Sequence, residues 1–262
     1  MILFKYRSIE FPNNDETFSE NFLRDVKCLL FDQIWFSSLK ALNDPFEGVF
    51  KFDRSISKMM KGFKKDLDTN KIERAKDNYL QLLKDNSGIL SLTTDNQNLL
   101  MWSHYTNNQK GYCIEYDFEE EKFLYANKIK NNKNDISLKK VLYSDNYVRT
   151  NILNNDYQLI FGNKSRCWSY EKEFRFISKN IGLHKFQNGC LKAIYLGADC
   201  DFVNETLISS IAYLKGAKVY KAKLFKDKFK LYFLPYDLDA LNKNINCKNF
   251  VQQAININLE NN

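Results

Sequence analysis

The fold is decided by residues 192–235, which read KAIYLGADCDFVNETLISSIAYLKGAKVYKAKLFKDKFKLYFLP. Three apolar-rich runs in this stretch, KAIYLG (192–197), AKVYKAKLF (217–225) and KLYFLP (230–235), predict strands. A helix is predicted between the first two runs, because apolar residues recur at helical spacing after Asp201 and Gly216 can end the helix. The stretch therefore predicts a fold that combines strands and helices.

The pattern outside this stretch predicts more strands, at 2–7, 34–38, 88–94, 111–117, 141–145 and 174–178, and a turn at 42–48. Helices are predicted after a capping box formed by Thr17 and Glu20, as a pair over 55–84, at 98–105 and over 146–164. Strands and helices do not alternate as regular βαβ units, which disfavours a doubly wound sheet. We predict an α+β fold with a split, mostly antiparallel central sheet flanked by helices.

The chain has 262 residues, within the size range of a single domain. It contains only 3 Pro and 9 Gly, and no stretch rich in either marks a linker between domains. We therefore predict a single α+β domain over 1–262. Its expected insertions lie at 51–86 and at 119–140, which is polar and rich in Lys and Asn, and a helical or loose tail follows residue 236.

Composition narrows the class of protein. No apolar run approaches the ~20 residues of a membrane span, and the charged residues Lys5 and Arg7 do not suit a signal peptide, so we predict a cytoplasmic protein without a membrane partner. The 6 cysteines are scattered, which favours reduced, buried thiols. With only 2 histidines, a His-rich metal site is excluded, and no metal cofactor is predicted.

The net charge of +7 is concentrated in lysine-rich segments, including residues 215–230. The sequence favours a solvated surface there. The alternative is that Lys221, Lys223, Lys226 and Lys228 follow the phosphates of a nucleic acid or nucleotide. Arginine is scarce beside lysine, which disfavours sequence-specific DNA binding.

Polar residues gather beside aromatic residues at five places: KYR (5–7), the serines of WFSS (35–38), NDPFE (43–47), MWSHY (101–105) and WSYEKEFR (168–175). Each cluster alone suits a turn, a core aromatic or a local ion pair. Their joint density at predicted strand ends favours a site. In that order along the chain, these motifs resemble the bacterial family of the domain of unknown function 2971, over roughly residues 1–235. The family name implies no reaction.

The chain has a weaker resemblance to ADP-ribosyltransferase-like domains. It implies a transferase-like sheet with a helical insertion and NAD as a substrate. Arg7, or Lys5 on the same strand face, would orient the NAD phosphates or ribose, and Ser37 or Ser38 would hold the nicotinamide end. Glu173, with Glu171, would be the catalytic carboxylate. The remaining predicted binding residues are Tyr6, Asn43, Asp44, Phe46, Trp102, His104, Tyr105 and Arg175.

This resemblance predicts an NAD-consuming enzyme with a protein or nucleic-acid acceptor, acting as a toxin or in anti-phage defence. It also predicts that Arg7, Ser37 or Ser38, and Glu173 converge on one cleft, with NDPFE beside it. Two alternatives stay open. One is a metal-dependent phosphodiesterase built on Asp44, Glu47, Glu171 and Glu173. The other is a non-catalytic module that binds a nucleotide or single-stranded nucleic acid by stacking.

Overall fold

The computed structural model describes residues 1–10, 18–49, 51–52, 69–118, 136–150, 160–186 and 189–260. Within them the chain forms two compact units. The first unit comprises residues 1–35, 92–131 and 183–262, and the second comprises residues 36–91 and 132–182. The chain passes between the units within β2 (Gln33–Ser38), β4 (Gly88–Thr93) and next to the start of β11 (Gly182–Lys185). The single-domain organisation and its two insertions stay predictions, and residues 53–68 and 119–135 lie outside the described residues.

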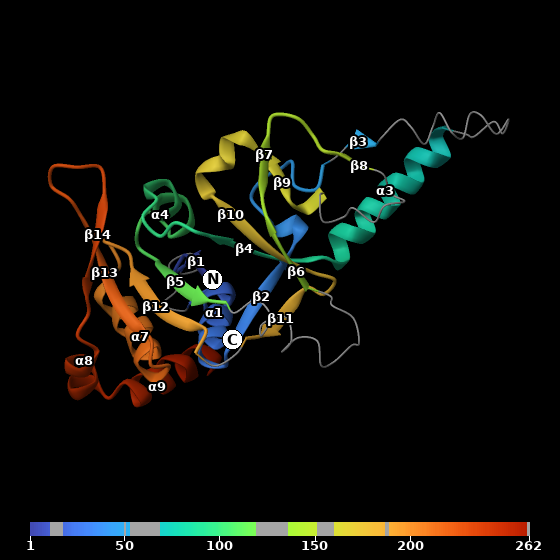
Figure 1. The fold of residues 1–262 in the computed structure, drawn as a ribbon. Helices are drawn as coiled ribbons and strands as arrows, with labels where there is room; N and C mark the ends of the chain where they lie inside the picture. Colours follow the sequence, from blue (N-terminus) through green and yellow to red (C-terminus); the bar gives the residue numbers. More distant parts are fainter. Residues whose placement is uncertain are drawn as a thin grey trace. The chain divides into compact units, whose positions relative to one another are not determined.

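The first unit is a sheet with helices against it (Figure 1). Its strands run in the order β1, β5, β12, β13 and β14. Their bounds are β1 (Ile2–Arg7), β5 (Tyr112–Asp117), β12 (Leu191–Leu196), β13 (Lys218–Leu224) and β14 (Leu231–Pro235). Neighbours are antiparallel except β12 and β13, which are parallel because α7 connects them across the sheet.

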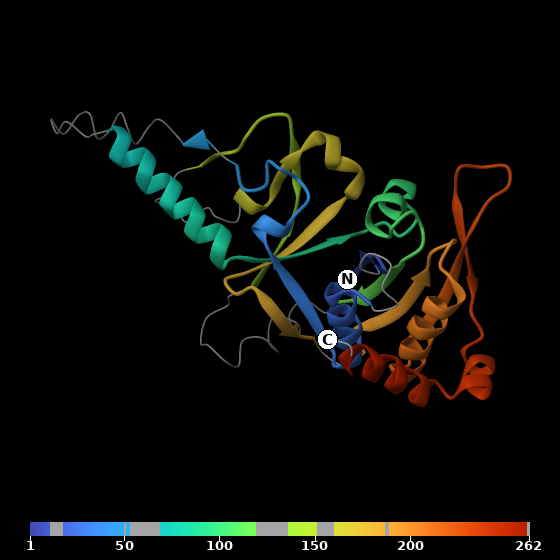
Figure 2. The same cartoon turned by 180° about the vertical axis from the view of Figure 1, so that it is seen from behind.

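Five helices belong to the first unit: α1 (Glu20–Leu30), α4 (Leu99–Tyr105), α7 (Phe202–Leu214), α8 (Leu238–Ile245) and α9 (Cys247–Glu260). Seen from behind, α7 lies along β12 and β13, and α9 packs against α7 (Figure 2). Leu207, Ile208 and Ile211 of α7 are buried, as are Ile194 and Val219 of the strands. This burial of apolar area is the main term that holds the unit together.

The second unit contains the C-terminal end of β2, the N-terminal end of β4, and two further strands. Those strands are β6 (Ile136–Lys140) and β10 (Glu173–Ser178), which pair with each other in antiparallel register, and β10 also pairs with β4. Its other elements are η1 (Leu39–Ala41), β3 (Lys51–Phe52), α3 (Thr69–Asn86), β7 (Leu142–Ser144), β8 (Arg149–Thr150), β9 (Asn163–Ser165) and η3 (Arg166–Glu171). An apolar core forms around Leu39, Ile89, Phe161 and Ile177.

The predicted α+β class, with a large and mostly antiparallel sheet, is confirmed. Three local predictions are corrected. Of the segment 146–164, predicted as one helix, residues 149–150 form β8, 163–164 belong to β9 and 160–161 are helical, while 151–159 lie outside the described residues. Residues 136–140 form β6 instead of a polar excursion, and each of these three strands pairs with another strand. Helix α1 is capped by Ser19, whose side chain accepts from the Phe22 N–H, and not by Thr17, which lies outside the described residues.

The prediction that the cysteines are buried is confirmed at five of the six positions. Cys28, Cys113, Cys190, Cys200 and Cys247 are buried, and Cys167 is exposed. In the part of the chain that the structure describes, no helix combines the length and the hydropathy that crossing a membrane requires.

Candidate functional site

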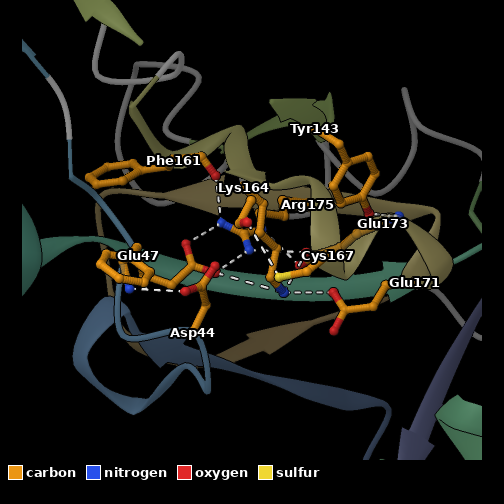
Figure 3. Close-up of polar contacts among 11 residues, drawn as sticks. Asp44, Glu47, Tyr143, Phe161, Lys164, Cys167, Glu171, Glu173 and Arg175 are labelled. Carbon is orange, nitrogen blue, oxygen red and sulfur yellow. Dashed lines mark hydrogen bonds and ion pairs between the residues drawn. The ribbon is translucent and has the colours of Figure 1, made fainter. Parts of the chain in front are cut away.

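The second unit contains a buried cluster of charged side chains around Arg175 (Figure 3). The guanidinium of Arg175 is fully buried and donates hydrogen bonds to two carboxylates. Its Nε donates to Glu173 Oε1 at 2.7 Å and its Nη2 to Glu173 Oε2 at 3.0 Å. Its Nη1 donates to Glu47 Oε2 at 2.8 Å and its Nη2 to Glu47 Oε1 at 2.5 Å. A fifth hydrogen bond joins Nη1 to the carbonyl of Phe161 at 2.7 Å. All five N–H groups of the guanidinium therefore donate to acceptors within the protein.

Lys164 supplies a second buried cation to the same carboxylates. Its Nζ donates to Glu171 Oε2 at 2.6 Å and to Glu173 Oε2 at 3.3 Å, and it lies 3.9 Å from Glu47 Oε1. The ammonium also lies 4.9 Å from the centre of the Trp168 ring, a distance at which the ring attracts a cation. We call Glu47, Lys164, Glu171, Glu173 and Arg175 the charged cluster.

The NDPFE turn places Glu47 in the cluster. Asp44 is buried and its Oδ1 accepts from the Phe46 N–H at 2.9 Å, while the Glu47 N–H donates to the Asp44 carbonyl at 3.1 Å. Gly48 follows at φ +70°, and a Cβ there would lie 2.6 Å from Leu39 Cδ2. The turn therefore requires glycine after Glu47. The loop lies beside Glu173, since the carboxylates of Glu47 and Glu173 both accept hydrogen bonds from Arg175.

The WSYEKEFR motif places the other two carboxylates. Glu171 ends η3, and Lys172 adopts a left-handed conformation at φ 47° before β10 begins. This reversal leaves Lys172 exposed and lets Glu171 and Glu173 both reach Lys164. Arg175 lies two residues further along β10, on the same face as Glu173. The Glu173 N–H donates to the Tyr143 hydroxyl at 2.8 Å, which fixes the start of the strand.

The electrostatics keep Glu173 ionised. Burial disfavours its charged form, but attraction to Arg175, the hydrogen bond from Arg175 and the charge of Lys164 outweigh burial and lower its pKa to about 2. The pKa of Arg175 is raised, because the carboxylates of Glu173 and Glu47 outweigh the cost of burying the guanidinium. Three carboxylates against two cations give the charged cluster a formal charge of −1.

Ser37 and Ser38 belong to the same unit as the cluster. Both are half-buried on β2, where they pair with Ile89 and Gly88 of β4. Because β4 also pairs with β10, the predicted serine strand lies two strands from the predicted carboxylate strand. Asn43 and Phe46 are exposed, and the Phe46 ring lies 6.3 Å from that of Tyr147.

The KYR and MWSHY residues belong to the first unit. Arg7 Nε lies 3.3 Å from Asp25 Oδ2 of α1, and the Tyr6 hydroxyl donates to the Asp95 carbonyl at 2.9 Å. Trp102 is a core residue whose indole N–H donates to the Asn96 carbonyl at 2.8 Å. Lys5 and Tyr105 are half-buried and His104 is exposed. The convergence of Arg7 with Glu173 stays a prediction.

No local pattern in the sequence marks Lys164 or Tyr143 as a site residue. Lys164 falls in a segment with a helical pattern, and Tyr143 reaches the cluster only because β7 pairs with β9. Glu47 lies in the NDPFE motif, but the sequence predicts a role for it only in the alternative of a metal-dependent phosphodiesterase. Among the described residues, no group of three or more His, Cys, Asp and Glu is arranged to hold a metal ion.

Together these observations describe a mixed α+β protein with a buried, hydrogen-bonded charged cluster at the start of a strand. Residues 101–176 match the family model described as protein of unknown function (DUF2971), which confirms the predicted resemblance to this family. The matched region includes Lys164, Glu171, Glu173 and Arg175, whereas Glu47 precedes it. No curated protein and no solved structure matches the chain.

Proposed function

We propose that this protein is an NAD-consuming enzyme of the ADP-ribosyltransferase type, with Glu173 and Glu171 as its carboxylates. The observation that carries the proposal is the charged cluster. It holds three carboxylates and two cations, with a formal charge of −1. Two of these carboxylates, Glu171 and Glu173, lie next to and at the start of β10, in the same sheet as the half-buried serines of β2. A carboxylate at the start of a strand and a hydroxyl on another strand of the same sheet are two of the three parts that the resemblance implies.

The chemistry needs an ionised carboxylate. When the bond between the ribose C1′ and the nicotinamide nitrogen breaks, the electron pair leaves with nicotinamide and a positive charge develops on the ribose. A nucleophile then bonds to C1′ and loses a proton. A fixed negative charge stabilises this cation in a site with little water. Glu173 meets the requirement, because its lowered pKa of about 2 keeps it charged at every physiological pH.

The two carboxylates receive different roles. Glu173 is held through both oxygens by Arg175 and Lys164, so we assign it the role of a fixed charge that does not exchange protons. Glu171 accepts from Lys164 at the edge of the charged cluster (Figure 3), and we assign it to orient the ribose hydroxyl or the incoming nucleophile. Ser37 or Ser38, in the same unit, would hold the nicotinamide end.

The geometry supports the transferase over a metal-dependent phosphodiesterase. Glu47, Glu171 and Glu173 direct their oxygens at Lys164 and Arg175, so two side-chain cations occupy the position between these carboxylates. The proposal also includes a protein or nucleic-acid acceptor and a role as a toxin or in anti-phage defence. Both depend on a measured activity.

The test is release of nicotinamide from NAD by the purified protein, with and without protein, RNA and DNA acceptors. Glu173→Gln keeps the size of the side chain and removes its charge, so we expect a loss of about 10²–10³ in rate. Glu171→Gln should lose less. Asp85→Asn is the matched control, because Asp85 forms an exposed ion pair with Lys40 in the same unit.

Circular dichroism and a thermal unfolding curve for each variant separate a catalytic loss from unfolding. Wild-type protein that releases no nicotinamide under any of these conditions contradicts the proposal. So does a folded Glu173→Gln variant with full activity, in which case Glu173 is only the structural partner of Arg175.

A further inference from the structure

The most exposed aromatic side chain among the described residues lies in a hairpin that the proposed function does not use. Strands β13 and β14 pair in antiparallel register from Tyr220 opposite Pro235 to Leu224 opposite Leu231. Residues 225–230 connect them, and the Phe225 N–H donates to the Lys230 carbonyl at 3.0 Å across the base of the loop. Within the first unit, this loop extends past the ends of the neighbouring strands (Figure 1). We call residues 218–235 the basic hairpin.

Large apolar side chains of the basic hairpin face water. Phe229 is 98% exposed, and Leu224, Phe225 and Tyr232 are also exposed. Single exposed apolar residues are common on protein surfaces, but several on one projecting element mark an interaction site. The Phe225 and Tyr232 rings lie 4.8 Å apart and support each other, whereas Phe229 is free to meet a flat ligand.

The charge of the basic hairpin identifies the kind of partner. Lys218, Lys223, Lys226, Lys228 and Lys230 are exposed, against the single acidic residue Asp227. Lys221 differs, because its Nζ pairs with Glu205 and donates to the Cys200 carbonyl at 3.1 Å. Of these exposed cations, Lys228 lies 5.8 Å from the centre of the Phe225 ring in the same loop. Five exposed lysines on about a dozen residues attract a polyanion.

A row of aromatic rings continues from the hairpin onto the sheet. Tyr220 and Tyr195 stack at 5.1 Å with an interplanar angle of 15°, and Phe233 lies 4.6 Å and Phe4 6.1 Å from Tyr195. Phe4, Tyr220 and Phe233 are half-buried, so part of each ring remains accessible. All four share one face of the sheet, because Tyr195 pairs with Tyr220, and Phe233 pairs with Ala222, two residues beyond Tyr220 on β13.

We propose that the basic hairpin and this aromatic row bind single-stranded nucleic acid without sequence preference. Exposed rings stack on unpaired bases, and the lysines contact the phosphates between them. A duplex hides its bases and would meet only the lysines. The scarcity of arginine fits this mode, since it needs no bidentate contact to base edges. The sequence alone favours a solvated lysine surface, and the aromatic side chains that the fold exposes change that interpretation.

The test measures binding of a fluorescent 20-nucleotide oligothymidylate and oligouridylate by anisotropy, without NAD, so its result does not depend on the proposed enzymatic activity. Phe229→Ala should weaken binding of both strands about 5- to 100-fold. Phe202→Ala is the matched control, because Phe202 is an exposed phenylalanine on α7 of the same unit, and it should leave binding unchanged.

Salt dependence tests the lysines. For single strands, each phosphate contact contributes about 0.7 to the slope of log affinity against log salt. The variant Lys226→Ala/Lys228→Ala should therefore lower the slope by about 1.4. The matched control is Lys243→Ala/Lys248→Ala, which removes the same charge from exposed positions of α8 and α9 and should not change it.

Any of the following results overturns the proposal. The first is no binding of either single strand at low salt. The second is equal affinity of wild type and Phe229→Ala, or equal affinity for a duplex of the same length, which reduces the hairpin to a general basic surface. The third is binding to vesicles that contain phosphatidylserine without binding to oligonucleotides, which makes the exposed aromatics a membrane contact.

Discussion

Replacing Arg175 with methionine tests the charged cluster directly. Methionine fills much of the volume of the arginine stem but donates no hydrogen bond, so Glu47 and Glu173 lose their shared partner while they remain buried. Removing one partner of a buried ion pair typically costs about 3–5 kcal/mol. The pKa of Glu173 gives a similar figure, since its shift from 4.5 to about 2 corresponds to about 3 kcal/mol of favourable interaction, part of which comes from Lys164.

The assay is urea unfolding of wild type and Arg175→Met at pH 7 and at pH 4.5. In the wild type the folded-state pKa of Glu173 lies below its unfolded value, so its contribution is complete above pH 4.5 and is lost as the pH falls towards 2. In Arg175→Met the loss of the cation raises the folded-state pKa, and protonation then relieves the buried charge. The difference in unfolding free energy should therefore be largest at pH 7 and smaller at pH 4.5.

Lys40→Met provides the matched control, because Lys40 forms an ion pair with Asp85 at 2.5 Å in the same unit, with side chains that are 54% and 45% exposed. An exposed pair contributes about 0–1 kcal/mol. If Arg175→Met costs no more than Lys40→Met, or if its cost is the same at both pH values, the interpretation of the charged cluster as an energetically coupled group is wrong.

Three further predictions concern single positions. Asp201→Ala removes the side chain that accepts from the Val203 and Asn204 N–H groups at the start of α7, and should lower the unfolding free energy in urea by about 1 kcal/mol. Gly216→Ala should lower it by about 1–2 kcal/mol, because Gly216 has φ +66° and a Cβ would meet no atom within 4 Å, so backbone strain is the only cost. In acid titration followed by circular dichroism, Glu173→Gln should lose less stability than wild type between pH 4.5 and 2, since it lacks the group whose pKa is lowered.

Local pattern was enough for most of the elements. The run at 192–235 predicted β12, α7, β13 and β14 in order, with Asp201 as the helix cap and Gly216 after its end, because each signal acts within a few residues. The ends of the segment 146–164, and residues 136–140, form strands that the local pattern does not predict. These strands are two to five residues long and exist only because distant segments pair with them, and no local periodicity records such pairing.

The same contrast between local pattern and tertiary contacts holds for the candidate site. The amino-acid pattern is enough to show which motifs are chemically unusual, including NDPFE and WSYEKEFR, because turn residues and dense charges beside aromatics stand out in a single chain. It takes the folded chain to show that Glu47 meets Glu173 through Arg175, 128 residues away from Glu47, and that Lys164 completes the group. The folded chain also shows that Lys221 is paired while Phe229 faces water. Whether a charged side chain is buried, and which group it pairs with, depends on which surfaces pack together in the tertiary structure. The same packing therefore decides whether the charge stabilises the fold or remains available to a ligand.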